Sequence, residues 1–212
     1  MHILYVYLHG AGIDPYIWTN HTNTRNLSTP SVDLVHNFNA LTSAYGWDGF
    51  LGAQHSNLCV TQIHDLRNYK GGKATEPPYA VKRAAAFAAI ACGCQGLLQY
   101  SYMDLFRSPA NVSFNPTNAT IDRRLHELSD LGNELASLEP FLTQPPPKVA
   151  VRITPTLQGH STLGTVRDAA GLGRRIILVN GNDESQAVAF SIGDAAERKV
   201  WMEPWDVQVL AL

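Results

Sequence analysis

Hydrophobic and polar residues follow two different patterns along the chain. Before residue 145, short apolar runs alternate with stretches whose apolar residues recur every three or four positions, the spacing of one helix face. The runs at 3–8 and 96–103 predict strands, and the stretches at 31–45 and 121–142 predict helices. The alanine-rich stretch 79–92 predicts a packed helix from its composition. This alternation of strands and helices is typical of a parallel α/β layer.

Residues 121–138 show the clearest helical pattern. Their apolar side chains fall at Ile121, Leu125, Leu128, Leu131, Leu135 and Leu138. Thr120 is the expected N-cap, since a threonine oxygen at that position can accept a hydrogen bond from a free backbone amide. Pro140 and the prolines at 145–147 should end the helix.

The polar stretch 54–78 contains two glycines at 71–72 and two prolines at 77–78. Such residues favour turns, so the stretch predicts a loop of about twenty residues. Loops of that length in compact domains are usually functional, and this one is the best candidate for a lid.

After the proline run 145–147, the chain consists of short apolar segments with a β pattern, separated by turn sequences such as 180–183. The segments predict strands at 149–153, 162–166, 175–179, 187–192, 199–201 and 207–212. We therefore expect an α/β domain at 1–144 and a small antiparallel β-sandwich of about six strands at 148–212.

Composition excludes several classes of function. The 212 residues include 16 Lys and Arg against 18 Asp and Glu, a formal net charge of −2, and contain no basic block of the kind that binds nucleic acid. The apolar runs are far shorter than the roughly 20 residues of a membrane span. The apolar start has no Lys or Arg before it and no cleavage site after it, so it predicts a strand and not a signal peptide.

The three cysteines, Cys59, Cys92 and Cys94, lack a second pair or a histidine cluster, so we expect buried free thiols, with no metal and no cofactor. Four N-glycosylation sequons favour an extracellular protein or one of the secretory pathway. Their asparagines are Asn20, Asn26, Asn111 and Asn118.

Residues 76–105, EPPYAVKRAAAFAAIACGCQGLLQYSYMDL, resemble the end of a glycoside-hydrolase-type TIM barrel. In such proteins a proline-rich loop leads into an alanine-rich helix and then into a final strand that ends in aromatic and acidic residues. The segments 12–16, 125–142 and 148–212 are similar to an earlier strand end, the closing barrel helix and the β-sandwich that often follows the barrel.

The resemblance implies about the last three or four βα units, because 147 residues precede the sandwich and a complete barrel takes about 250. We therefore expect another chain or a missing N-terminal segment to complete the barrel. Without one, the strand edge before Ile3 and an inner face formed by Leu98, Tyr100 and Tyr102 would be exposed and favour self-association.

The function implied by the resemblance is that of a glycoside hydrolase-like protein that acts on or binds carbohydrate. Glycosidases need two carboxyl groups, and barrel enzymes place them after strands. The segment that matches the seventh strand, 50–55, has no acidic residue. We therefore expect little or no hydrolysis by this chain. The alternative is a non-catalytic carbohydrate-binding or structural component assembled with another chain.

Asp14, Glu76 and Asp104 are the candidate catalytic carboxyl groups, because each lies at a predicted strand end or in the loop that follows. Each has a structural alternative: Asp14 precedes Pro15 and suits a turn, Glu76 could begin the helix near Tyr79, and Asp104 could form an ion pair.

Aromatic and polar residues near the same strand ends are the candidate sugar-binding groups, since aromatic faces and hydrogen-bonding side chains line such clefts. They are Tyr16, Trp18, Gln54, His55, Tyr100 and Tyr102. The two tyrosines near residue 100 could instead be core, and Gln54 and His55 could be ordinary loop residues.

A rival interpretation is an esterase of the α/β-hydrolase type. Residues 6–12, VYLHGAG, look like an oxyanion-hole turn, and 159–164, GHSTLG, nearly match the nucleophile motif G-x-S-x-G. The second glycine is one residue too late, and the following pattern predicts a strand where the motif requires a helix.

Overall fold

The structure is a computed structural model, and it describes the secondary-structure elements and several of the turns between them. The described residues are 4–7, 10–13, 56–62, 78–91, 96–100, 105–106, 117–144, 147, 149–156, 162–182 and 184–212.

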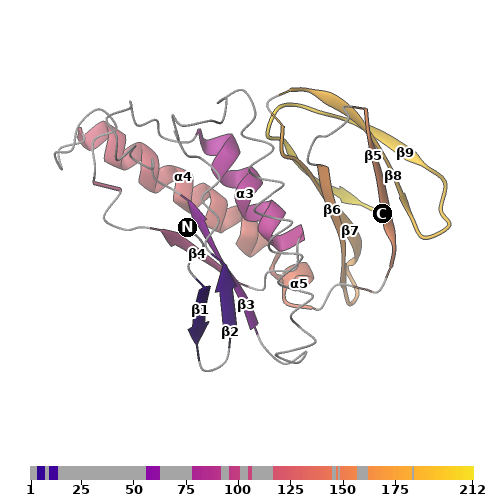
Figure 1. Cartoon of the computed structure of the whole chain (residues 1–212), viewed down its shortest axis with the longest axis horizontal. Coiled ribbons are helices and arrows are strands. Elements are labelled where there is room, and N and C mark those ends of the chain that lie inside the picture. The colour runs from indigo at the N-terminus through magenta and orange to yellow at the C-terminus, as the bar shows by residue number, and fades with distance from the viewer. Residues whose placement is uncertain are drawn as a thin grey trace.

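The amino-terminal strands form one four-stranded sheet in the order β1-β2-β3-β4 (Figure 1). The strands are β1 (Leu4–Tyr7), β2 (Gly10–Ile13), β3 (Ser56–Gln62) and β4 (Gly96–Tyr100). The first pair is antiparallel, whereas β2, β3 and β4 run parallel. In the register, Ile13 lies opposite Cys59 and Gln62 lies opposite Tyr100.

One sequence prediction for this sheet needs correction. The strand predicted at 3–8 is present as β1, and it forms a short antiparallel hairpin with β2, which pairs with β3 on its other side. The loop expected at 54–78 contains β3, because the apolar residues Leu58, Cys59 and Val60 lie between two parallel neighbours that satisfy the backbone on both sides. The expected helix at 31–45 lies outside the described residues.

Helix α3 (Tyr79–Ala91) connects β3 to β4 and agrees with the predicted helix. The residues from Ala84 to Ile90 are all buried, and Phe87 has no exposed surface. Such a helix needs neighbours on more than one side. It contacts β3 and β4 on one side and β6, β7 and β10 of the sandwich on the other (Figure 1).

Helix α4 (Asn118–Ser137) is followed by the short helix α5 (Glu139–Leu142). The cap differs from the prediction: Thr117 is the N-cap, and its hydroxyl oxygen accepts a hydrogen bond from the backbone amide of Thr120 at 3.3 Å. The predicted apolar face is buried only in part, since Leu131 is 4% exposed and Leu125 is 46% exposed.

The six strands expected after the proline run are all present. They are β5 (Val151–Pro155), β6 (Thr162–Ala169), β7 (Gly173–Asn180), β8 (Gln186–Ile192), β9 (Arg198–Met202) and β10 (Val207–Ala211). They form two antiparallel sheets, ordered β10-β7-β6 and β5-β8-β9.

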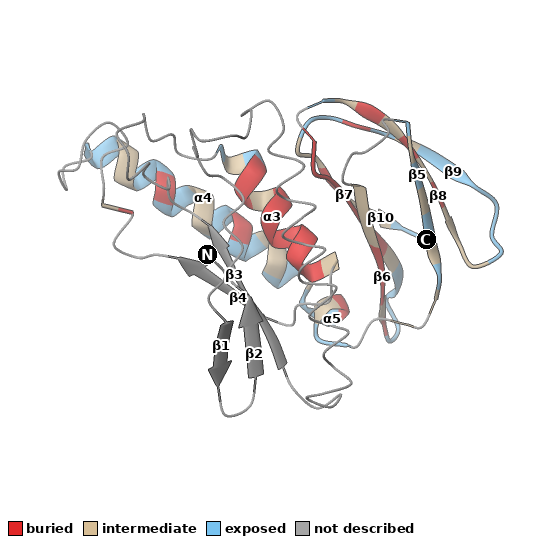
Figure 2. Cartoon of the chain, viewed as in Figure 1, coloured by how far each residue is buried: buried red, intermediate tan, exposed pale blue. Residues whose placement is uncertain are grey.

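Two apolar cores lie on opposite faces of the β10-β7-β6 sheet. One joins α3 and Leu131 of α4 to Ile177, Val179 and Val207. The other fills the sandwich between the two sheets, with Phe190 and Met202 at its centre. Figure 2 shows the buried residues along α3, β7 and β8 and the exposed residues on β9.

The prediction of a mixed α/β and antiparallel β protein is therefore confirmed. A partial barrel is not shown, since the described strands of the first sheet form a single four-stranded layer.

Candidate functional site

The carboxyl ends of β2, β3 and β4 lie at one edge of the first sheet, because the three strands are adjacent and parallel. In α/β proteins, the loops that leave this edge carry the binding and catalytic residues. Asp14 is the next residue after β2, and Tyr102 and Asp104 follow the last residue of β4. Glu76 belongs to the connection from β3 to α3, which leaves the sheet at the same edge. We call this edge the carboxyl edge.

Most predicted site residues lie outside the described residues, and the structure leaves their roles as predictions. These are Asp14, Tyr16, Trp18, Asn20, Asn26, Gln54, His55, Glu76, Tyr102, Asp104 and Asn111. Tyr100 is the last residue of β4, and Asn118 is an exposed residue in the first turn of α4.

The position of β3 adds residues to the carboxyl edge that were not predicted from the sequence. Because β3 ends at Gln62, the residues that follow its carboxyl end are those from Ile63 onward, including His64 and Asp65. Gln54 and His55, by contrast, come before β3 in the sequence. The signal that could have located β3 is the apolar group Leu58-Cys59-Val60 within a polar stretch.

A second group of functional interest lies in the sandwich, around Trp201 and Glu203. The Trp201 side chain is 60% exposed, and its indole N–H donates to Glu203 Oε1 at 2.8 Å. The Ser185 hydroxyl donates to the other carboxylate oxygen, Oε2, at 2.5 Å. The Trp201 carbonyl accepts from Gln208 Nε2 at 2.6 Å. An exposed aromatic ring is therefore fixed in one orientation.

A buried amide network supports the turn that carries Glu203. Asn180 has no exposed surface, and its Nδ2 donates to the carbonyls of Glu203 at 2.8 Å and Glu184 at 3.0 Å. Its Oδ1 accepts from Asn182 at 2.8 Å and from Gln186 at 2.7 Å. Asn182 and Gln186 hold the Asn180 side chain in place. Through Asn180, the network therefore fixes the backbone at Glu184 and at Glu203.

The backbone of the same turn is unusual at Trp205, which has a φ of 57°. A bulky residue rarely adopts this left-handed conformation. The Trp205 amide donates to the Asn182 carbonyl at 2.9 Å, and its side chain packs against the core that contains α3. The turn is thus held both by the amide network around Asn180 and by the core that contains α3.

The hydrogen bonds from Ser185 and Trp201 lower the pKa of Glu203 below its ordinary value of 4.5. Glu203 is therefore a carboxylate at neutral pH. A general acid for glycoside cleavage needs a raised pKa, so the chemistry of this group is hydrogen-bond acceptance and not proton donation.

Charged side chains also connect α3 to its neighbours. Arg83 makes a two-point ion pair with Glu134 of α4, at 2.6 and 2.8 Å, and both of its terminal nitrogens donate to the Val207 carbonyl at 3.2 Å. The hydrogen bonds to Glu134 raise the pKa of Arg83. Burial, assisted by the charge of Glu134, raises the pKa of Tyr79. This cluster holds the two helices to β10 and is structural.

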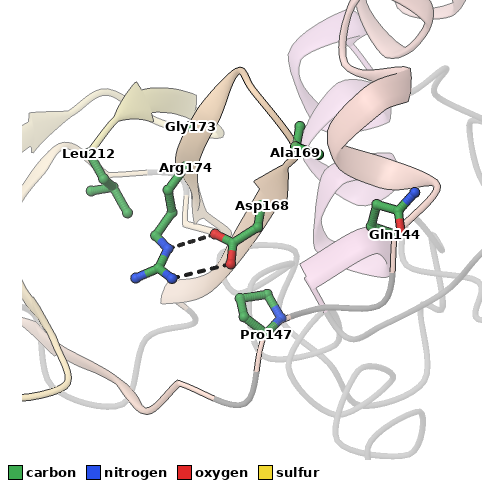
Figure 3. A pocket seen from close by; sticks show the side chains of 8 residues that line it. Gln144, Pro147, Asp168, Ala169, Gly173, Arg174 and Leu212 are labelled. Carbon is green, nitrogen blue, oxygen red and sulfur yellow. Dashed lines mark hydrogen bonds and ion pairs between the residues drawn. The ribbon is translucent and has the colours of Figure 1, made fainter.

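A shallow depression of about 910 Å³ lies beside the β6–β7 hairpin and the carboxyl terminus (Figure 3). Its charged groups are Asp168 and Arg174, which bind each other at 2.6 and 3.2 Å. That ion pair raises the pKa of Arg174. Because the two charges satisfy each other at an open surface, the depression offers little to a ligand.

Comparison with known proteins gives no family: no protein-family model matches the chain, and no curated protein matches it. Within the described ranges, no three histidine, cysteine or acidic residues are grouped to hold a metal ion. No described helix is both long and apolar enough to span a membrane.

Proposed function

We propose that this chain is a glycoside hydrolase-like protein that binds carbohydrate at the carboxyl edge of β2, β3 and β4. The observation that carries the proposal is the unit β3–α3–β4, two parallel neighbouring strands joined by a helix that also packs on an antiparallel sandwich. Residues 76–105, which carry the resemblance to barrel glycosidases, supply this helix and the second strand.

The arrangement supports the candidate residues by position. Asp14, Asp65 and Asp104 follow the carboxyl ends of three adjacent parallel strands, and Tyr100 ends the third. Acidic and aromatic residues at one edge suit sugar binding, because hydroxyl groups need acceptors and sugar rings stack on aromatic faces. Asp65 also supplies an acidic residue near β3, where the segment 50–55 has none.

The test is binding and hydrolysis by the full chain. Binding to a set of soluble polysaccharides is measured by isothermal titration calorimetry, and turnover is measured with aryl glycosides. We expect binding that falls in Tyr100→Ala and is unchanged in Leu172→Ala, a variant of an exposed residue in the β6–β7 hairpin. We expect little or no turnover.

Two results would contradict the proposal in different ways. No binding to any polysaccharide would remove the carbohydrate function altogether. Turnover that disappears in Asp14→Asn, Asp65→Asn or Glu76→Gln would keep the carbohydrate function and show that the chain is an active glycosidase.

A structural component assembled with another chain is the second candidate function, and Leu125 favours it. This residue belongs to the apolar face predicted for α4, yet it is 46% exposed, whereas Leu131 two turns later is buried. An exposed apolar side chain on a partly buried apolar face suits contact with a partner. Light scattering tests this: a monomer in both the unmodified chain and Leu125→Glu would exclude self-association through α4.

A further inference from the structure

Strand β9 is an edge of the β5-β8-β9 sheet and lies at the outer margin of the sandwich (Figure 1). It pairs with β8 on one side, and no other described strand pairs with it on the other. The opposite edge, β5, contacts β6 and contains Pro155, which has no amide hydrogen to donate. Because an open edge strand is a template for another strand, β9 is the edge of this sheet that suits further pairing.

The backbone groups of two β9 residues point away from β8. The Thr156 amide donates to the Ala187 carbonyl at 3.1 Å, so Ala187 directs its backbone groups toward the β5 side. Trp201 lies opposite Ala187, and this pair is therefore a non-hydrogen-bonded one. The amide and carbonyl of Trp201, and those of Lys199 two residues earlier, face the open edge. The Trp201 carbonyl accepts from Gln208 Nε2 at 2.6 Å and can accept a second hydrogen bond.

The outward side chains of β9 place opposite charges on the two sides of one aromatic ring. Val200 and Met202 face the core of the sandwich, so Lys199 and Trp201 face outward. The indole N–H of Trp201 donates to Glu203 Oε1 at 2.8 Å, which places the Glu203 carboxylate beside the ring. A cation two residues before Trp201 and an anion two residues after it make the strand complementary to a reversed copy of itself.

An antiparallel pairing with a two-fold axis at Trp201 uses this complementarity. Lys199 of each copy then lies opposite Glu203 of the other, and the two Trp201 rings lie opposite each other. Opposite charges and aromatic pairs both stabilise neighbouring strands in this arrangement.

Other registers of the same edge lose the charge match. An axis at Val200 would place Glu197 opposite Glu203 of the other copy, and parallel pairing in register would place Lys199 opposite Lys199. Like charges directly opposite each other are destabilising. The charges therefore select one direction and one register.

Lys199 and Glu203 cannot satisfy each other within one chain. They are four residues apart, which is about 13 Å along a strand. Lys199 is exposed and forms no ion pair with any described residue. Glu203 accepts from Trp201 and Ser185 and has further acceptor positions on its two oxygens. Each group is thus available to the other across an interface between two copies.

We propose that β9 pairs with β9 of a second copy of this chain, antiparallel and with the two-fold axis at Trp201, to form a symmetric dimer. The two sheets then join into one, in the order β5-β8-β9-β9-β8-β5. This interface is separate from the carboxyl edge and from the exposed Leu125 of α4. A contact between two five-residue strands belongs with interfaces below about 1,200 Å², so the dimer is a weak one.

The experiment is sedimentation velocity of the full chain over a concentration series, at low and high salt. We expect a monomer–dimer equilibrium that weakens as salt increases, because exposed charges are screened. Lys199→Glu and Glu203→Lys should each raise the dimer dissociation constant at least about tenfold, because two attractive contacts become repulsive.

Mixing the two variants is the decisive measurement. Each contact in a mixed dimer joins an acidic side chain of one variant to a basic side chain of the other, so the mixture should associate although each variant alone does not. A fluorescent label on one variant detects the mixed dimer. A variant that had merely lost its fold could not be restored in this way.

The matched control is Arg152→Glu, which makes the same change of charge at an exposed residue on the same outer face, on the β5 strand. It should dimerise as the unmodified chain does. A loss of association equal to that in Lys199→Glu would show a general effect of net charge and overturn the inference.

Three other results would also overturn it. These are a monomer at every concentration, a mixture of the two variants that stays monomeric, and a dimer that is unchanged in Lys199→Glu but lost in Leu125→Glu, which would place the contact on α4. None of them bears on carbohydrate binding at the carboxyl edge, which is tested separately with polysaccharides.

Discussion

Phe87→Ala tests whether the two parts of the chain unfold as one unit. Phe87 has no exposed surface, and it belongs to the core that α3 shares with Ile177, Val179 and Val207 of the sandwich. Arg83 lies 5.4 Å above its ring and joins α4 through Glu134. A cavity at this position should therefore weaken the helices and the sandwich together.

The magnitude follows from the buried area. A phenylalanine buries about 150–250 Å², which at about 25 cal/mol per Å² is about 4–6 kcal/mol before the part that alanine retains is subtracted. Measured phenylalanine-to-alanine losses in cores are about 3–5 kcal/mol. With a urea m-value of about 2 kcal/mol per M, a loss of about 4 kcal/mol moves the unfolding midpoint by about 2 M.

The assay is urea unfolding followed by two probes. Far-UV circular dichroism reports the helices. Tryptophan fluorescence reports the sandwich when Trp18, Trp47 and Trp205 are replaced by phenylalanine. The remaining tryptophan, Trp201, lies in β9, whereas Trp205 packs against the core that contains α3. The matched variant is Phe190→Ala, which opens a similar cavity in the core between the two sheets.

If the shared core couples the two parts, each variant lowers the midpoint of both probes by the same amount. Leu172→Ala should leave both midpoints unchanged, since its side chain is exposed. The reasoning is refuted if Phe87→Ala shifts only the circular dichroism transition while the fluorescence transition stays in place. The sandwich would then be a domain that folds independently of α3.

Three further predictions concern polar groups. Arg83→Lys should lower the unfolding free energy by about 1–2 kcal/mol, because an ammonium cannot reproduce the two-point pair with Glu134; an unchanged melting temperature would contradict it. Asn180→Ala should lower the unfolding free energy by about 2–4 kcal/mol in urea unfolding, because the buried side chains of Asn182 and Gln186 and two backbone carbonyls each lose a hydrogen bond. A loss no larger than that of an exposed substitution would show that the network is not needed for stability. Because the folded-state pKa of Glu203 is lowered, its hydrogen bonds contribute above pH 4.5 and are lost as the pH falls through that lowered pKa. The indole proton resonance of Trp201 should shift in that range, and the shift should be absent in Glu203→Gln.

The sequence by itself determined α3, α4 and all six strands of the sandwich. The alanine-rich composition of 79–91 specifies α3, and the leucine spacing from Leu128 to Leu138 specifies α4, because both signals are local and need no reference to the rest of the chain. The short segments between turn sequences after the proline run specify β5 to β10 in the same way. β5 and β8 carry the two-residue pattern of a strand with one face in the core, whereas β7 has a continuous apolar run because both of its faces are buried.

Only the tertiary structure decided how these elements meet. β3 leaves a weak pattern, because its stability comes from pairing with β2 and β4, which are distant in sequence. The sharing of α3 between the first sheet and the sandwich depends on contacts between residues more than 80 positions apart, such as Phe87 and Ile177 in one core. The hydrogen bond between Trp201 and Glu203 likewise could not be predicted from sequence. A tryptophan two residues before a glutamate is a common pattern, and the two side chains meet here because Asn180 holds the turn at Glu203.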